Sequence, residues 1–264
     1  MFLFRRIAYC WRVFIKLMTL FWFGMGSLFL ATSVFPTLYL LSGFSKERFG
    51  RWARLVVHYS HKLALAHFVY FGLGTIHVQH RERLKGLRSK VIVANHPSIL
   101  DVVILFSLIP NGDCIVKGSL GQNRFMKGIV NSIYIVNSKM FTKQLAETDK
   151  SLQRGNCLII FPEGTRSVPG VRWQFKKGAA RFALHSKCDV VPVYIGSNDF
   201  LGLRKHDPVL SVNRTERYHY NLDILDPIPI EKFLDYPPSQ AANLLTREMQ
   251  NVLEARRDQD AANA

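Results

Sequence analysis

Two short segments of this sequence place reactive side chains directly after an apolar run. In the first, residues 91–103 read VIVANHPSILDVV, so His96 follows a strand-like run and Asp101 comes five positions later. Across a turn that leads into a helix, a carboxylate at this spacing can accept the imidazole Nδ1–H, which leaves Nε2 free as a base. We therefore predict that His96 and Asp101 form a catalytic pair acting on a substrate hydroxyl, which replaces the serine of a Ser-His-Asp triad. The alternative is that Asn95 and Asp101 cap a helix beside an inactive histidine.

The second segment, residues 158–167, reads LIIFPEGTRS and again leads from an apolar run into a polar loop. Glycine lets a backbone approach a ligand closely, and arginine can hold a phosphate through two parallel hydrogen bonds. The predicted substrate-binding residues are Asn95, Glu163, Gly164, Thr165 and Arg166. An ordinary turn with a surface ion pair is the alternative. No further His or carboxylate near His96 has the spacing of a metal ligand, so no metal site is expected.

These segments belong to a pattern of apolar, β-branched runs that alternate with stretches of helical character, which is typical of an α/β fold. Strands are expected at residues 91–94, 114–116, 133–136, 158–161, 190–195 and 218–225. Helices are expected at residues 98–108, 124–130, 142–154, 177–186 and 240–257. The predicted architecture is a mixed, largely parallel sheet covered by helices. Such sheets place the polar residues that follow their strands at one edge, where active sites form.

The first part of the chain has the character of a hydrophobic helical membrane anchor. Residues 17–44 contain no charge over 28 positions, and a helix of that length would span about 42 Å, more than the roughly 30 Å of a hydrocarbon core. A signal peptide, a single spanning helix and a helical hairpin bent near Pro36 are all open. Basic residues on both flanks favour the hairpin or an interfacial anchor. We predict anchoring helices over residues 1–55 and a catalytic domain over residues 56–264.

The charge balance indicates anionic partners. The chain has 35 Lys and Arg against 19 Asp and Glu, a formal net charge of +16, which suits anionic lipid, an acidic carrier or nucleic acid. Arg5, Arg12 and Lys16 form either a cationic stripe for lipid headgroups or a plain basic flank. The uncharged anchor and the lack of a recognisable motif argue against nucleic acid as a partner. Four scattered cysteines indicate a reducing, cytoplasmic setting.

Taken together, the two segments resemble the glycerolipid acyltransferase family, whose best-known members are the 1-acylglycerol-3-phosphate acyltransferases. The shared features are Asn-His-x-x-x-x-Asp and, about 60 residues later, Phe-Pro-Glu-Gly-Thr-Arg-Ser. Further matches are Lys177-Gly178 and Val191-Pro192-Val193. The similarity extends from about Lys90 to Gly196.

The resemblance implies that His96 is the general base on an acceptor hydroxyl and that Asp101 orients it. It implies acyl-CoA or an acyl carrier protein as co-substrate, with no metal or organic cofactor. Glu163, Gly164 and Arg166 would bind the polar head of a lysolipid acceptor. The implied partners are the donor, the lysolipid and the membrane lipid bilayer. The expected location is the cytoplasmic face of the inner (plasma) membrane.

One departure from the family pattern concerns the acceptor. Family members that use lysophosphatidic acid carry an element like Phe-Ile-Asp-Arg between the two main motifs, whereas residues 133–138 here read IYIVNS. A later lysine does not replace the planar fork of arginine. The acceptor is therefore open between 1-acylglycerol-3-phosphate, or a related lysolipid, and a non-phosphate acceptor such as an ornithine-type lysolipid. Lys117, Lys139 and Lys177 are candidate contacts to acceptor or donor. A non-catalytic membrane assembly partner is the remaining alternative.

Overall fold

The apolar runs form one seven-stranded sheet in the computed structural model, which describes residues 2–117, 134–137 and 141–262. The strands are β1 (Gly74–Gln79), β2 (Val91–Ala94), β3 (Gly112–Lys117), β4 (Tyr134–Asn137), β5 (Cys157–Ile160), β6 (Val190–Ser197) and β7 (Tyr218–Ile224). Their order is β1-β7-β6-β2-β5-β3-β4, and every neighbouring pair is parallel except β6 and β7. The predicted mixed, largely parallel sheet is confirmed; β1 was not predicted.

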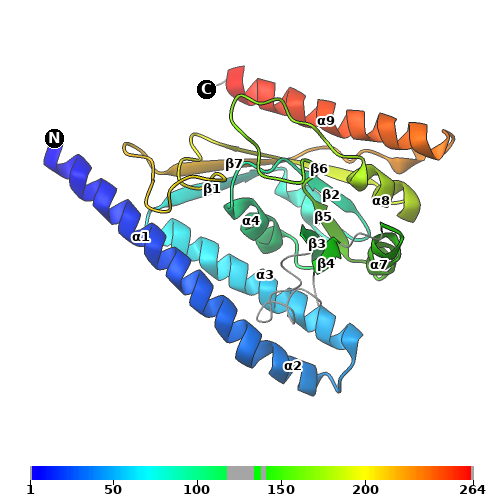
Figure 1. The fold of residues 1–264 in the computed structure, drawn as a ribbon, viewed down its shortest axis with the longest axis horizontal. Coiled ribbons are helices and arrows are strands. Elements are labelled where there is room, and N and C mark those ends of the chain that lie inside the picture. Colours follow the sequence, from blue (N-terminus) through cyan, green and yellow to red (C-terminus); the bar gives the residue numbers. More distant parts are fainter. Residues whose placement is uncertain (1, 118–133, 138–140, 263–264) are drawn as a thin grey trace.

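Helices cover both faces of this sheet (Figure 1). On one face lie α3 (Lys46–Tyr70) and α4 (Leu100–Leu108); on the other lie α7 (Phe141–Gln153), α8 (Gly178–Ser186) and α9 (Pro238–Ala262). Short 3₁₀ turns occupy Arg81–Leu84 and Ile230–Phe233. Adjacent residues of β2 enter opposite cores, Ile92 on the α3 side and Val93 on the α8 side, as expected of a strand buried on both faces. The helix expected at 124–130 lies outside the described residues.

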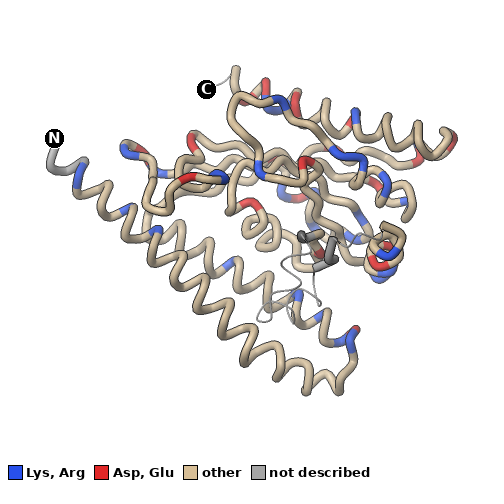
Figure 2. The backbone as a smooth tube through the Cα atoms, viewed as in Figure 1, with Lys and Arg blue, Asp and Glu red and all other residues tan. Residues whose placement is uncertain are grey.

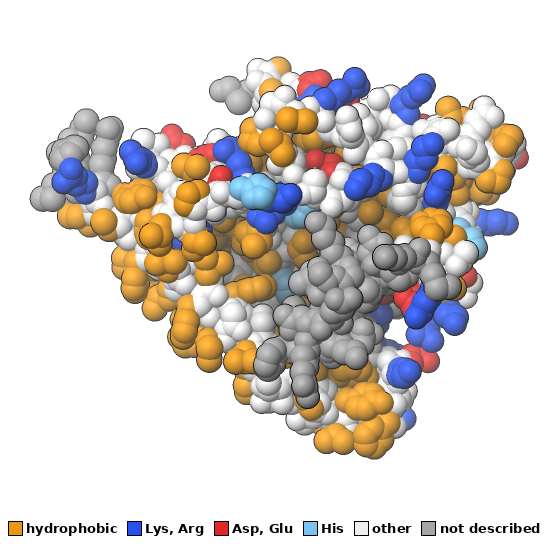
Figure 3. Space-filling view, in the orientation of Figure 1, with side chains coloured by type: hydrophobic (Ala, Val, Ile, Leu, Met, Phe, Trp, Pro, Cys, Tyr) orange, Lys and Arg blue, Asp and Glu red, His pale blue; other side chains and the backbone are white. Residues whose placement is uncertain are grey.

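The N-terminal segment forms a long helical hairpin on the α4 side of the sheet (Figure 1). The first arm is α1 (Phe2–Phe29), a π-helical turn (Leu30–Val34) and α2 (Phe35–Leu41), and α3 is the second arm. The chain reverses between them through Gly43 and Phe44, whose φ angles are 63° and 60°. Figure 2 shows few charges along the first arm beyond its N-terminal half. Apolar side chains are exposed along this arm, among them Trp11, Phe21 and Trp22 (Figure 3).

The hairpin reverses at residues 42–45, so the bend expected near Pro36 is wrong. Pro36 lies in the first turn of α2, where its missing N–H and fixed φ are tolerated. The π-helical turn before it is a wider local geometry that lets the helix continue. The second arm, α3, runs unbroken across the predicted domain boundary between residues 55 and 56. Among the described residues, one helix, Arg6–Leu41, is long and apolar enough to cross a membrane by length and composition.

Two of the three residues considered for a lipid-binding stripe are buried against protein instead. Arg12 is 7% exposed, and its Nη2 donates to a backbone carbonyl of the loop at residues 202–214, at 2.8 Å. Lys16 is 4% exposed, and its Nζ donates to two carbonyls of the same loop, at 2.7 and 2.8 Å. The side chain of Arg5 lies outside the described part of the chain. The prediction of a lipid-binding stripe is therefore wrong for Arg12 and Lys16. Their side chains connect the first arm to this loop.

The contacts of Lys16 predict that Lys16→Met destabilises the fold. Methionine keeps an apolar stem of similar length but leaves the carbonyls of Gly202 and Ser211 without their donor. We expect the free energy of unfolding to fall by about 1–3 kcal/mol, the cost of leaving a buried polar group unpaired. The measurement is the midpoint of thermal unfolding in detergent. Lys16→Arg keeps the donors and should recover part of the loss, whereas an unchanged midpoint for methionine would contradict this role.

Candidate active site

The carboxyl ends of β2 and β5 bring the two predicted segments together. The strands are parallel neighbours that end at Ala94 and Ile160. Just beyond them, the Ser167 N–H donates to the His96 carbonyl at 2.7 Å, and the His96 N–H donates to Glu163 Oε1 at 2.9 Å. Segments distant in the sequence thus form one polar edge of the sheet, the position where α/β folds carry their sites.

The expected contact between histidine and aspartate is present at this edge. His96 Nδ1 lies 2.8 Å from Asp101 Oδ2; the Asp101 side chain is 0% exposed and that of His96 is 18% exposed. The imidazole stacks on Phe161, with 4.1 Å between ring centroids. Because a carboxylate only accepts hydrogen bonds, Nδ1 carries the proton. Nε2 makes no hydrogen bond with any described residue, so it is available as a base.

Further donors fix the Asp101 carboxylate. The Ser98 N–H donates to Oδ2 at 2.8 Å, and the Ser98 hydroxyl donates to Oδ1 at 2.5 Å. Burial raises the pKa of Asp101, while hydrogen bonds from His96 and Ser98 favour the ionised form and oppose that rise. The Tyr220 hydroxyl donates in turn to Ser98 Oγ at 2.9 Å. Tyr220, Ser98 and Asp101 therefore form a hydrogen-bonded series that orients the imidazole.

Tyr220→Phe should weaken this series without opening a cavity. Tyr220 is fully buried in β7, and the substitution removes only its hydroxyl. One hydrogen bond is worth about 0.5–1.5 kcal/mol, so we expect kcat to fall about 2- to 10-fold. KM should stay unchanged, because Tyr220 acts through Ser98 and Asp101 rather than on substrate. Steady-state kinetics would test this, with the exposed Tyr236→Phe as control; a change in KM alone would contradict the positioning role.

Glu163 and Asn95 form hydrogen bonds within the protein that connect neighbouring parts of the site. Glu163 is 9% exposed, and its Oε1 accepts from the His96 N–H and the Ser167 hydroxyl, both at 2.9 Å. Burial raises the pKa of Glu163, and these hydrogen bonds oppose the rise. Asn95 is 2% exposed and exchanges two hydrogen bonds of 2.8 Å with the backbone of Ile195. Both were predicted to bind substrate; their geometry fits positioning of the two loops and β6.

The second loop presents Gly164, Thr165 and Arg166 to its surroundings. Gly164 has a φ of +70°, and a Cβ built there would lie 2.7 Å from Lys176 Nζ, so this ammonium lies against the loop. Arg166 Nη1 donates to the Leu203 carbonyl at 3.3 Å. Arg166 has no ion pair within the described part of the chain, which leaves its other N–H groups for an anion. Lys176 was not among the predicted site residues.

The three candidate lysine contacts stay predictions. Lys177 is the exposed N-cap residue of α8 and has no side-chain capping bond. Lys117 ends β3, but its side chain is outside the described residues, as is the whole of Lys139. The stretch at residues 133–138 is described only as the backbone of β4.

A cleft of about 730 Å³ opens beside the two loops. Its lining includes Pro97 beside the histidine, Ser167 of the second loop and Gly196 near the end of β6. Apolar walls come from Val168, Trp173 and Phe200, and charged side chains of Arg172, Arg204, Glu254 and Arg257 also line the cleft. Within the residues that the structure describes, no group of three or more His, Cys, Asp or Glu could hold a metal ion.

The comparisons with known proteins agree with this geometry. Residues 75–196 match the family model described as Acyltransferase, a range that contains both loops. The human 1-acyl-sn-glycerol-3-phosphate acyltransferase beta is 30% identical over 149 residues, covering 52% of each chain. The alpha enzyme of Ovis aries is 24% identical over 181 residues, covering 64% of this chain and 60% of its own. This chain thus spans about half of the human relative's length.

The fold also has a solved counterpart. The crystal structure of the 1-acyl-sn-glycerophosphate (LPA) acyltransferase PlsC from Thermotoga maritima superposes with a TM-score of 0.69. The match covers 94% of this chain and 96% of that one at 19% sequence identity. At this identity the match supports the fold alone. Residues 75–196, which carry both loops, are similar to the acyltransferase family.

Proposed function

We propose that this protein transfers a fatty acyl group from a thioester donor to the hydroxyl of a lysolipid at a membrane surface. The observation that carries the proposal is the pairing of His96 with the buried Asp101, which leaves Nε2 without a hydrogen bond to any described residue. Both residues lie in the range that matches the Acyltransferase family model. The relatives' names describe acyl transfer to 1-acyl-sn-glycerol-3-phosphate. The donor is acyl-CoA or an acyl carrier protein, and no metal or organic cofactor takes part.

In the proposed reaction, His96 Nε2 removes the proton from the acceptor hydroxyl as its oxygen attacks the thioester carbonyl. The new C–O bond gives a tetrahedral oxyanion. When that intermediate collapses, the C–S bond breaks and the imidazolium returns its proton to the leaving thiolate, so the histidine is regenerated. Asp101 accepts from Nδ1 throughout and stabilises the imidazolium. The protein itself forms no covalent bond with the acyl group.

Arg166 supports a phosphate-bearing acceptor. Its guanidinium donates one N–H to the Leu203 carbonyl, and its other N–H groups can bind a phosphate. Lys176 lies against the same loop at Gly164 and adds a second positive charge. We therefore favour 1-acylglycerol-3-phosphate or a related lysolipid over an ornithine-type acceptor. The non-catalytic alternative finds no support in a site whose base and orienting carboxylate are both in place.

The hairpin is the proposed membrane contact. Its first arm exposes large apolar side chains such as Phe14, Phe21 and Phe29, between 53% and 61% exposed, an unfavourable surface in water. The second arm adds Tyr59 and Leu63 on its exposed side, 63% and 73% exposed. Basic residues at both ends of the apolar run favour a first arm that lies along the membrane surface over one that crosses the bilayer, on the cytoplasmic face of the inner membrane.

The test of this function is a transfer assay with the full chain in nonionic detergent. Radiolabelled acyl-CoA or acyl carrier protein is offered with 1-acylglycerol-3-phosphate, an ornithine-type lysolipid or a lysolipid with a neutral head. We expect label in the phosphate-bearing product. Preference for the ornithine-type lysolipid would overturn the acceptor but keep the enzyme. No transfer from either donor by a folded protein would overturn the function and favour a non-catalytic partner.

A further inference from the structure

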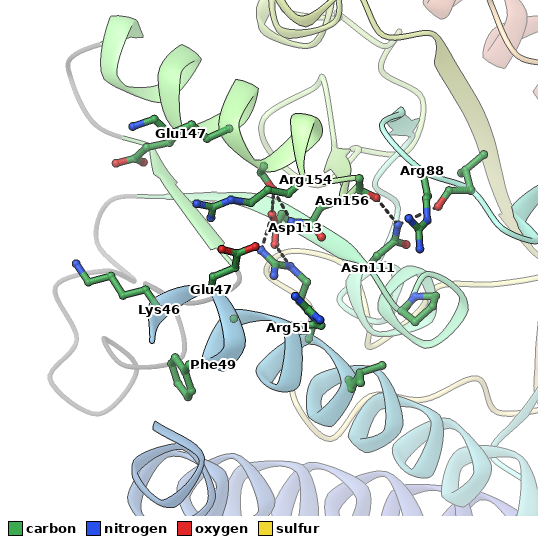
Figure 4. Close-up of a pocket in the computed structure, with 18 of the residues that line it drawn as sticks. Lys46, Glu47, Phe49, Arg51, Arg88, Asn111, Asp113, Glu147, Arg154 and Asn156 are labelled. Carbon is green, nitrogen blue, oxygen red and sulfur yellow. Dashed lines mark hydrogen bonds and ion pairs between the residues drawn. The ribbon is translucent and has the colours of Figure 1, made fainter. Parts of the chain in front are cut away.

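Figure 4 shows a second and larger cleft, of about 1360 Å³. It lies at the opposite edge of the sheet from His96, which follows β2. It is bounded by the start of α3, by α7 and by the segments that lead into β2, β3 and β5. These segments precede their strands, whereas the catalytic loops follow β2 and β5. We call this space the amino-edge cleft. It is therefore separate from the proposed acyl-transfer site.

The floor of the amino-edge cleft is a hydrogen-bonded network in which the buried Asp113 carboxylate is already paired. Arg54 holds Asp113 through two hydrogen bonds, of 2.7 and 3.0 Å, and the Ser151 hydroxyl donates to the same carboxylate. Asn111 Nδ2 donates to two backbone carbonyls, at 2.9 and 2.8 Å. Asp113 is 2% exposed. The floor is thus ordered, and its negative charge is already neutralised by Arg54.

The remaining charges on the rim are predominantly positive. Besides Arg54, five cations line the cleft against two other carboxylates; the cations are Lys46, Arg51, Arg88, Lys150 and Arg154, and the carboxylates are Glu47 and Glu147. None of these seven forms an ion pair with a described residue. The cations come from α3, from the segment before β2, from α7 and from the turn after α7 (Figure 4), so they surround the space. Arginines grouped in this way suit a phosphate, which each can bind through two N–H groups.

The cleft also has an apolar side next to the proposed membrane contact. Tyr39, Phe49 and Leu55 line it from the two arms of the hairpin. Directly beyond Tyr39, the end of the hairpin exposes Leu40, Leu41 and Phe44, each more than 60% exposed (Figure 3). An apolar wall of this kind would not help to bind a free anion. It would help to bind a phospholipid, because its phosphate and the start of its acyl chains require a cationic and an apolar surface side by side.

We propose that the amino-edge cleft binds the headgroup of an anionic membrane phospholipid, apart from the lysolipid used as acceptor. The bound phosphate lies among the arginines of α3, of the turn after α7 and of the segment before β2, and the acyl chains leave along the hairpin. The site rests on the proposed membrane contact of the hairpin but not on acyl transfer. Binding is therefore measured directly, so that a failure of this proposal is distinct from a failure of the enzymatic one.

The experiment is a calorimetric titration of the full chain in nonionic detergent with dihexanoylphosphatidylglycerol. The parallel probes are dihexanoylphosphatidylcholine, inorganic phosphate and coenzyme A. The cleft variant is Arg88→Gln with Arg154→Gln, two exposed cations with no ion pair among the described residues. The matched control is Lys232→Gln with Arg247→Gln, which removes the same charge at two exposed residues that do not line the cleft. Thermal unfolding of each variant shows whether it is folded.

We expect saturable binding of the phosphatidylglycerol, weakened about tenfold or more in the cleft variant because two charged donors are lost. The control variant should bind as the parent does, and the phosphatidylcholine should bind more weakly. Equal losses in both variants, or no saturable binding, would overturn the proposal. Phosphate or coenzyme A binding as tightly as the lipid would overturn the choice of ligand. If the cleft variant does not fold, Arg51→Gln with Lys150→Gln replaces it.

Discussion

Replacing His96 by alanine is expected to lower kcat by about 10²- to 10⁴-fold, the usual contribution of a positioned general base. The reason is geometric. Nδ1 is held by a buried carboxylate at 2.8 Å, the ring is stacked on Phe161, and Nε2 has no other partner among the described residues. Alanine removes the base while the backbone bonds of residue 96 to the second loop remain possible.

The rate is measured in detergent with donor and lysolipid both saturating. His185→Ala is the matched control, because that histidine is exposed near the end of α8 and should leave the rate unchanged. Thermal unfolding of His96→Ala should stay close to that of the parent protein. A kcat within a factor of a few of the parent's would contradict the assignment of the base.

Asp101→Asn is expected to reduce kcat by a similar factor, about 10²- to 10⁴-fold, with a small change in stability. Asparagine offers one acceptor oxygen where the carboxylate accepts from His96 Nδ1 and from the Ser98 N–H and hydroxyl. Its amide N–H₂ can also force the imidazole into the wrong tautomer. The imidazolium of the transition state then lacks its negative partner. Steady-state kcat against pH, together with thermal unfolding, is the measurement.

The expected stability of Asp101→Asn follows from the sign of the pKa shift. Burial raises the pKa of Asp101 above its unfolded value, so keeping the carboxylate ionised costs the folded protein free energy once the pH is above that raised pKa. Asparagine removes this cost and offsets part of the lost hydrogen bonding. A variant that loses activity only because it unfolds would contradict the positioning role of Asp101.

The two loops of the candidate site were predictable because their signals are local. Residues 91–94 and 158–160 are uninterrupted apolar runs, and the polar residues that follow them are adjacent in sequence. Two such strand ends meet whenever the strands are parallel neighbours, as β2 and β5 are. The five-residue spacing of His96 and Asp101 was enough to predict their contact, which is present at 2.8 Å.

What was missed depends on contacts between distant parts of the chain. Tyr220 reaches Ser98 only because β7 lies beside β6 in the folded sheet, and no local pattern marks it as a site residue. From the sequence alone, Lys16 could face either lipid or protein. Only its contacts with the loop at residues 202–214 show that it faces protein. The second arm of the hairpin was missed because α3 is rich in charge, although Ala53, Val57 and Phe68 are buried. Apolar composition alone therefore located only the first arm.

The most direct test of the mechanism is the intact mass of the protein mixed with excess acyl-CoA, before and after a lysolipid is added. Direct attack by the acceptor predicts no protein species heavier by one acyl group, and donor consumption that starts only with the lysolipid and matches the acylated product. An acylated protein that passes its acyl group to the lysolipid would contradict the account, because the nucleophile would then be a protein side chain and not the hydroxyl activated by His96.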